Sequence, residues 1–243
     1  SALPCVGGTE NVSLFAWYGV QGGMTQFGPW PVYPGHGDVY GRDVIGKHAS
    51  HFGADVVITL IDVWTQQGVG EIVAPAKWLP WFPVDTEPVA QRVVDALKDA
   101  HLPVVYSRHG EKALRAAGVH SAYVPHGIET DVFKLLPDDE VAELRQMVWG
   151  EECTHATLMV AANKAGDRKA FAVNLRAWAA FAKEYGPGAR LYVHTDPTRA
   201  AGGLDLVELA HACGIQEGQI VFPDRYSYYL GYPAEWMALL YNA

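Results

Sequence analysis

Short apolar runs that alternate with segments of helical periodicity constrain the fold of this sequence more than any other feature. This alternation is typical of α/β architecture with parallel sheets. The runs are continuously apolar, which predicts strands that are covered on both faces. We predict strands at residues 12–18, 56–62, 78–82, 103–107 and 121–125, and a second set at residues 157–162, 191–195 and 219–222.

Amphipathic helices are expected between these strands. In residues 171–185, five apolar side chains recur at helical spacing: Phe171, Leu175, Trp178, Ala182 and Tyr185. Further apolar stripes predict helices near residues 89–97, 206–213 and 233–241. The Pro- and Gly-rich segment 28–41 is predicted to be a long ordered loop.

The alternation of apolar runs and helical segments stops between residues 134 and 152, where the sequence predicts a short helix followed by a polar stretch. We therefore predict an N-terminal Rossmann-like domain at residues 1–135, a linker at 136–152 and a C-terminal domain at 153–243.

Charge and composition exclude some classes of protein. The chain carries 27 acidic against 18 basic residues, a formal charge of −9, so it does not suit nucleic-acid binding. No run of eighteen apolar residues occurs and the start lacks a signal-peptide pattern, which predicts a cytoplasmic protein without a transmembrane segment. The three cysteines are widely spaced and predict neither a disulfide framework nor a metal site.

A basic loop lies between a predicted strand and the predicted helix at 171–185. It carries Lys164, Arg168 and Lys169 beside a helix N-terminus, where free backbone N–H groups attract anions. This arrangement predicts a diphosphate site that needs no metal ion. The spacing is neither a P-loop nor a dinucleotide fingerprint, so a solvated loop is the alternative interpretation.

Residues 123–133, YVPHGIETDVF, resemble the V-P-x-G-[VI]-[DE]-T-x-x-F pattern of the retaining glycosyltransferase family 4. Four further segments follow in that family's order: residues 158–171, 191–196, 220–224 and 237–243. The resemblance implies two Rossmann-like domains of the glycosyltransferase B-type fold. It also implies that the chain lacks the family's first strand and its C-terminal glutamate loop, so that the second domain is incomplete.

The resemblance also assigns roles to individual residues on the donor side. Lys169 matches the family's phosphate-binding lysine, and Asn163 stands where relatives often have an arginine, for which Arg168 is a substitute. Asp224 and Tyr226 fall in the loop near the nucleotide base, where Tyr226 is expected either to stack on the base or to be a buried loop aromatic.

Two aspartates are the candidate catalytic residues. Asp85 follows the strand at 78–82, near where relatives place a histidine close to the transferred sugar, and Asp62 ends the strand at 56–62. Carboxyl ends of parallel strands are where α/β sheets bind ligands. Each aspartate has an alternative role as the cap of the helix or turn that follows it.

The resemblance, together with the basic loop, implies retaining, metal-independent transfer of a sugar from a nucleotide-diphosphate sugar to an unknown acceptor. Hinge closure at residues 134–152 would exclude water, and no cofactor is expected beyond the donor itself. The alternatives are a shortened, non-catalytic binding or assembly module and, less favoured, a sugar-nucleotide epimerase. A sheet without its outer strand also favours a homo-oligomer.

Overall fold

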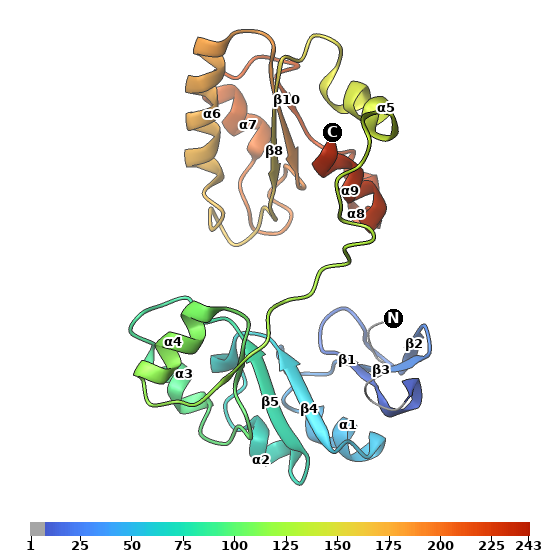
Figure 1. Cartoon of the computed structure of the whole chain (residues 1–243), viewed down its shortest axis with the longest axis vertical. Coiled ribbons are helices and arrows are strands. Elements are labelled where there is room, and N and C mark those ends of the chain that lie inside the picture. The colour runs from blue at the N-terminus through green and yellow to red at the C-terminus, as the bar shows by residue number, and fades with distance from the viewer. Residues whose placement is uncertain (1–7) are drawn as a thin grey trace. The chain divides into compact units, whose positions relative to one another are not determined.

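The computed structural model describes residues 8–243, and these form parallel sheets flanked by helices, which confirms the predicted α/β class (Figure 1). The chain divides into two compact units between Gly127 and Ile128. Each unit has hydrophobic core clusters of its own.

The first unit contains two sheets. A parallel sheet has the order β4-β5-β6-β7, and its strands are Val56–Leu60, Lys77–Phe82, Val104–Val105 and Ala122–Tyr123. A smaller mixed sheet has the order β1-β3-β2, from Leu14–Ala16, Trp30–Pro34 and Thr25–Phe27. The helices of this unit are α1 (Ile45–Phe52), α2 (Val69–Val73), α3 (Gln91–Ala96) and α4 (Arg108–Ala116).

All four of these helices pack on one face of the β4–β7 sheet. Each contributes side chains to a single core cluster that also contains Trp78 and Phe82 of β5 and Val105 of β6. On the strands, these three residues share one face because side chains alternate. Trp78 is 1% exposed, and its indole N–H donates to Thr59 Oγ1 at 3.0 Å.

The opposite face of β4 is open to solvent, so the prediction that the strands are covered on both faces is wrong for this strand. Val56, Ile58 and Leu60 are 47%, 64% and 54% exposed, while the intervening residues are half-buried. The reason is that the helices that cover this sheet share one core, on its other side.

Segment 28–41 is only partly a loop, because it contains the turn of the β2–β3 hairpin and the whole of β3. Phe27 pairs with Trp30, and Gly28 turns the chain with a left-handed φ of 58°. Pro31 and Pro34 lie within β3, the middle strand of its sheet. Prolines normally argue against a central strand, which is why the sequence predicted a loop here.

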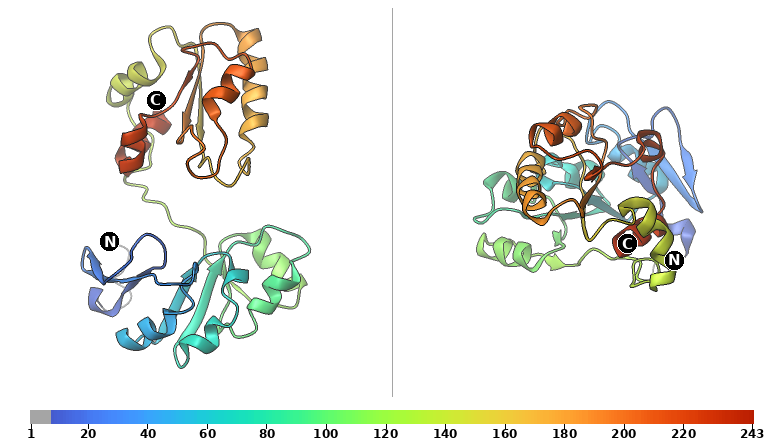
Figure 2. Two further views of the ribbon diagram at one scale, coloured as in Figure 1. Left: turned by 180° about the vertical axis from the view of Figure 1, so that it is seen from behind. Right: turned by 90° about the horizontal axis from the view of Figure 1, so that it is seen from above.

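The second unit is a three-layer sandwich. Its parallel sheet has the order β10-β9-β8, from Ile220–Val221, Ala189–His194 and His155–Val160. Helices α6 (Phe171–Tyr185) and α7 (Leu206–Ala212) cover one face, while α5 (Asp138–Trp149), α8 (Arg225–Leu230) and α9 (Ala234–Asn242) lie on the other (Figures 1 and 2). The central strand is buried on both sides: Leu191 packs toward α6 and α7, and Tyr192 packs toward α5 and α9.

The predicted linker at 136–152 is wrong, because most of it is the helix α5 and this helix belongs to the second unit. Arg145 donates from Nε to the carbonyl of Ala243 at 3.0 Å. The amide of Asn242 in α9 donates to the carbonyl of Lys134 and accepts from the backbone N–H of Leu136. Residues 134–149 are therefore fixed to α9, and the exposed segment that joins the units lies earlier, at residues 124–131.

Two further sequence predictions, on the cysteines and on membrane-spanning segments, can be compared with the structure for residues 8–243. Cys153 and Cys213 are free thiols, and Cys5 lies outside the described residues. Between residues 8 and 243, no helix has both the length and the apolar character that a bilayer crossing requires.

Candidate functional site

Asp62 and Asp85 lie at the carboxyl ends of neighbouring parallel strands in the first unit. Asp62 comes two residues after β4, and Asp85 comes three residues after β5. Both are exposed, and neither carboxylate has a hydrogen-bond or ion-pair partner among residues 8–243. Asp62 precedes the short 3-10 helix Val63–Thr65 but makes no side-chain capping bond. Its carboxylate is thus not used as a helix cap.

Tyr106 lies at the same edge of the sheet as the two aspartates. It directly follows β6, the next strand of the same sheet. Burial raises the pKa of the Tyr106 hydroxyl, and the negative charges of Asp62 and then Asp85 raise it further. The hydroxyl is protonated at neutral pH, so it can act as a hydrogen-bond donor at the edge that also carries two carboxylate acceptors.

An aromatic triad, Trp81, Tyr106 and His126, covers the same edge of the sheet. The imidazole of His126 lies 4.8 Å from the Trp81 ring and 4.2 Å from the Tyr106 ring, between centroids. The Trp81 indole N–H donates to the carbonyl of Val124 at 2.9 Å, which fixes its ring. Sequence reasoning missed these three residues, although each lies at or just beyond a strand end, which is the signal that identified the aspartates.

In the second unit, Lys164, Arg168 and Lys169 are exposed in the loop that leads from β8 into α6. No ion pair within the described part of the chain engages any of the three. The loop is held by its backbone: Gly166 N–H donates to the carbonyl of Gly202 at 2.8 Å, and Lys164 forms a β-bridge with Gly202. Ala165 and Ala170 have left-handed φ values of 54°, a conformation that strains residues with a Cβ.

The N-terminus of α6 already has one carboxylate beside it. The Asp167 oxygens accept from the Ala172 N–H at 3.3 and 3.4 Å. These bonds are long and the side chain is exposed, so the contact is weak. An anion bound at this helix end would have to displace Asp167.

Asn163 is not available for donor binding, so this part of the sequence prediction is corrected. The residue is 4% exposed, and its Nδ2 lies 2.7–3.1 Å from three backbone carbonyls, those of Asp196, Thr198 and Leu204. Its Oδ1 accepts from the Leu204 N–H at 2.9 Å. The amide therefore fixes the loop after β9, and a Cβ at Gly203 would collide with it.

Asp224 is also occupied, because it caps α8. Its carboxylate accepts from the backbone N–H and the hydroxyl of Ser227 at 2.8 and 2.9 Å. These bonds lower the pKa of Asp224. Tyr226, by contrast, is exposed, so the interpretation as a buried aromatic is wrong and its ring is free to stack on a ligand.

His194 ends β9 inside a group of aromatic rings. The T-shaped rings of Tyr228 and Tyr232 lie 5.4 and 5.1 Å away, and Trp236 and Tyr192 lie within about 6 Å. Nδ1 of His194 is buried and has no hydrogen-bond partner among the described residues. Burial lowers the pKa of His194.

This environment predicts an acid-sensitive second unit. A histidine whose pKa is lower in the folded state binds its proton more readily once the unit unfolds. Protonation therefore favours the unfolded state, and the free energy of unfolding is highest above about pH 6.5 and decreases as the pH falls below that value. We expect the free energy of unfolding to drop between about pH 7.5 and about pH 5.5, and to drop less in His194→Phe. Urea titrations at both pH values measure it. His211→Ala, at an exposed position, should keep the wild-type difference; an unchanged difference in His194→Phe would disprove the assignment.

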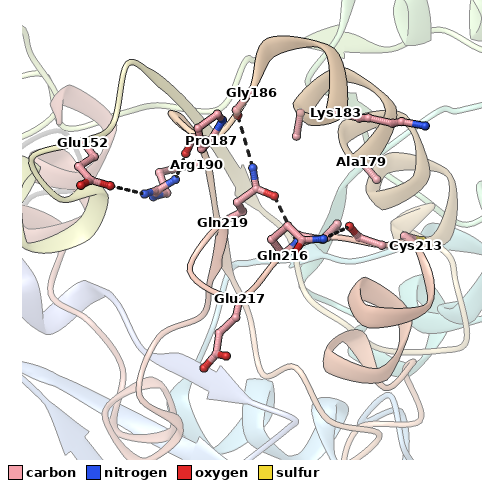
Figure 3. Close-up of a pocket in the computed structure, with 13 residues that line it drawn as sticks. Glu152, Ala179, Lys183, Gly186, Pro187, Arg190, Cys213, Gln216, Glu217 and Gln219 are labelled. Atoms are coloured by element: carbon pink, nitrogen blue, oxygen red, sulfur yellow. Dashed lines mark hydrogen bonds and ion pairs between the residues drawn. The ribbon is translucent and has the colours of Figure 1, made fainter.

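In the second unit, a cavity of about 700 Å³ lies near the amino ends of β9 and β10, at the end of the sheet opposite the basic loop (Figure 3). Several of its polar groups bind one another or the backbone: Arg190 donates to the carbonyl of Pro187, and Gln219 accepts from the Gln216 N–H at 3.2 Å. No predicted site residue lines it. Since α/β sheets bind ligands at their carboxyl ends, we assign this cavity no role.

The described residues include no group of three or more His, Cys, Asp or Glu side chains placed to hold a metal ion. The fold and the site define a Rossmann-like α/β protein whose polar and charged side chains gather at the carboxyl edges of its parallel sheets.

Comparison with known proteins supports this fold class. The chain is similar to the N-terminal domain of Candida albicans trehalose-6-phosphate phosphatase, with a TM-score of 0.52 and 14% identity, over 87% of this chain and 56% of that structure. At this identity the likeness concerns the fold alone, and the chain spans just over half of that structure's length. No protein-family model and no curated protein matches the sequence.

Proposed function

We propose that this protein is a metal-independent, retaining glycosyltransferase that uses a nucleotide-diphosphate sugar. The observation that carries the proposal is a set of three cations without ion-pair partners among residues 8–243, namely Lys164, Arg168 and Lys169, at the start of the fifteen-residue helix α6. Fixed cations and a helix N-terminus stabilise a leaving diphosphate. The proposal includes a cytoplasmic location, as the sequence predicts.

In the proposed reaction, the bond between the anomeric carbon and the diphosphate oxygen breaks, and the electron pair stays on the diphosphate. An acceptor hydroxyl attacks the anomeric carbon on the same face, and its proton passes to the departing phosphate oxygen. Lys169 and Arg168 hold the diphosphate, and Tyr226 stacks on the base. Asp62 and Asp85 bind hydroxyl groups at the carboxyl edge of the β4–β7 sheet, because they are exposed acceptors without partners in the described part of the chain.

Nucleotide binding tests the donor site directly. We expect one of UDP, GDP and ADP, or its sugar conjugates, to raise the melting temperature in scanning calorimetry. Saturation at about one hundred times the dissociation constant adds about 2.7 kcal/mol, which corresponds to several degrees. Lys169→Ala should lose most of this shift. Lys183→Ala, a control in the last turn of α6, should keep it.

A non-catalytic binding or assembly module is the second candidate, and two observations favour it. Asp167 already contacts the start of α6, and Asn163 is fully engaged by the backbone. If no nucleotide shifts the melting temperature of the folded protein, the glycosyltransferase proposal fails and the module remains. A shift that survives Lys169→Ala would instead place the donor elsewhere.

A further inference from the structure

The aromatic triad, Trp81, Tyr106 and His126, gathers side chains from three adjacent strands at the edge that carries Asp62 and Asp85. Trp81 comes from β5, Tyr106 directly follows β6, and His126 lies three residues after β7. The rings contact one another, and the indole of Trp81 is held by the Val124 carbonyl. Trp81 is therefore held in place, and the three rings form one aromatic surface.

The triad is also accessible. His126 is exposed, and Trp81 and Tyr106 are half-buried, so none of the rings is enclosed in the core. The Tyr106 hydroxyl has no hydrogen-bond partner among residues 8–243. Half-exposed rings with polar tips are the groups that ligand sites use as apolar walls.

The negative charge at this edge disfavours an anionic ligand. Asp62 and Asp85 follow β4 and β5 at the same edge of the sheet as the triad, and neither has an ion-pair partner among residues 8–243, so a phosphate group here would be repelled. Hydroxyl groups, in contrast, donate to carboxylates in charge-assisted bonds. A ring with an apolar C–H face and several hydroxyl groups satisfies both the aromatic triad and the two acceptors.

We propose that the triad binds a pyranose ring, with hydroxyl groups of that sugar donating to Asp62 and Asp85, so that the acceptor is a carbohydrate. The description as an acceptor rests on the proposed function, whereas binding of the sugar itself does not. The site is distinct from the basic loop before α6, since the two lie in different units.

Saturation-transfer NMR tests this inference with four probes: the methyl α-glycosides of glucose, mannose, galactose and N-acetylglucosamine. We expect at least one to receive saturation from the full chain, most strongly on one C–H face of its ring. His126→Ala, at an exposed position, should abolish most of the signal. Asp85→Asn should weaken binding roughly tenfold, as expected for loss of one charge-assisted hydrogen bond. Tyr229→Ala is the control, because this tyrosine is 84% exposed in the other unit.

The inference is overturned if none of the four glycosides binds the folded wild-type protein, or if the signal survives both variants. Circular dichroism confirms folding in each case. Nucleotide binding is read separately by calorimetry, so a protein that binds a glycoside but no nucleotide keeps the sugar site and rejects the glycosyltransferase. A protein that binds a nucleotide but none of the glycosides rejects the sugar site and keeps the glycosyltransferase proposal.

Discussion

Replacement of Asn163 by alanine is expected to lower the free energy of unfolding of the second unit by about 3 kcal/mol. The substitution removes the hydrogen-bond partners of three backbone carbonyls and of the Leu204 N–H in one step. Buried backbone groups without partners cost free energy because they have lost their water. Urea denaturation followed by circular dichroism measures the change, and the two units are fitted as separate transitions if two appear.

Asn174→Ala is the matched control for this experiment. Asn174 lies in α6, is exposed, and makes one side-chain hydrogen bond of 3.3 Å, to the carbonyl of Lys169. We expect a change within about 0.5 kcal/mol for it. If Asn163→Ala were as stable as this control, the role of Asn163 in fixing the loop after β9 would be rejected.

In the first unit, Trp78→Ala is expected to cost about 4 kcal/mol. The indole is 1% exposed in the core shared by α1–α4, so its removal loses buried apolar surface and leaves a cavity. It also leaves the Thr59 hydroxyl without the indole N–H that donates to it. The loss should appear as a lower midpoint for the unfolding transition of the first unit.

Trp64→Ala is the control for this experiment, because it removes a tryptophan of the same unit that is not buried in the core. Trp64 is 40% exposed, and the guanidinium of Arg92 lies over its ring at 4.8 Å. An exposed cation–π contact contributes about 0.5–1 kcal/mol, so we expect a loss near 1 kcal/mol. Equal losses for the two tryptophans would contradict the core described for the first unit.

The sequence predicts the strands and helices well where a local pattern is sufficient. The stripe from Phe171 to Tyr185 predicts α6 with both ends correct, because burial of one helix face imposes its period on the sequence. The same approach misses β2 and β3, since the backbone pairing of Pro31 and Pro34 depends on partners elsewhere in the chain.

The site could be predicted only in part, for a similar reason. Asp62 and Asp85 are found at strand ends, where the fold class places ligands. The engagement of Asn163 is decided by carbonyls more than thirty residues away, which no local pattern reveals. The linker prediction fails in the same way: the hydrogen bonds that join Asn242 with Lys134 and Leu136 connect segments more than one hundred residues apart.

The open face of β4 has a practical consequence for any measurement of ligand binding. Environment-sensitive dyes fluoresce on contact with apolar surface, and Val56, Ile58 and Leu60 present such a surface on the folded protein. A melting curve followed with such a dye will start from a high baseline, because the dye binds before unfolding begins. Calorimetry and intrinsic tryptophan emission avoid this background, so a small ligand-induced shift remains visible.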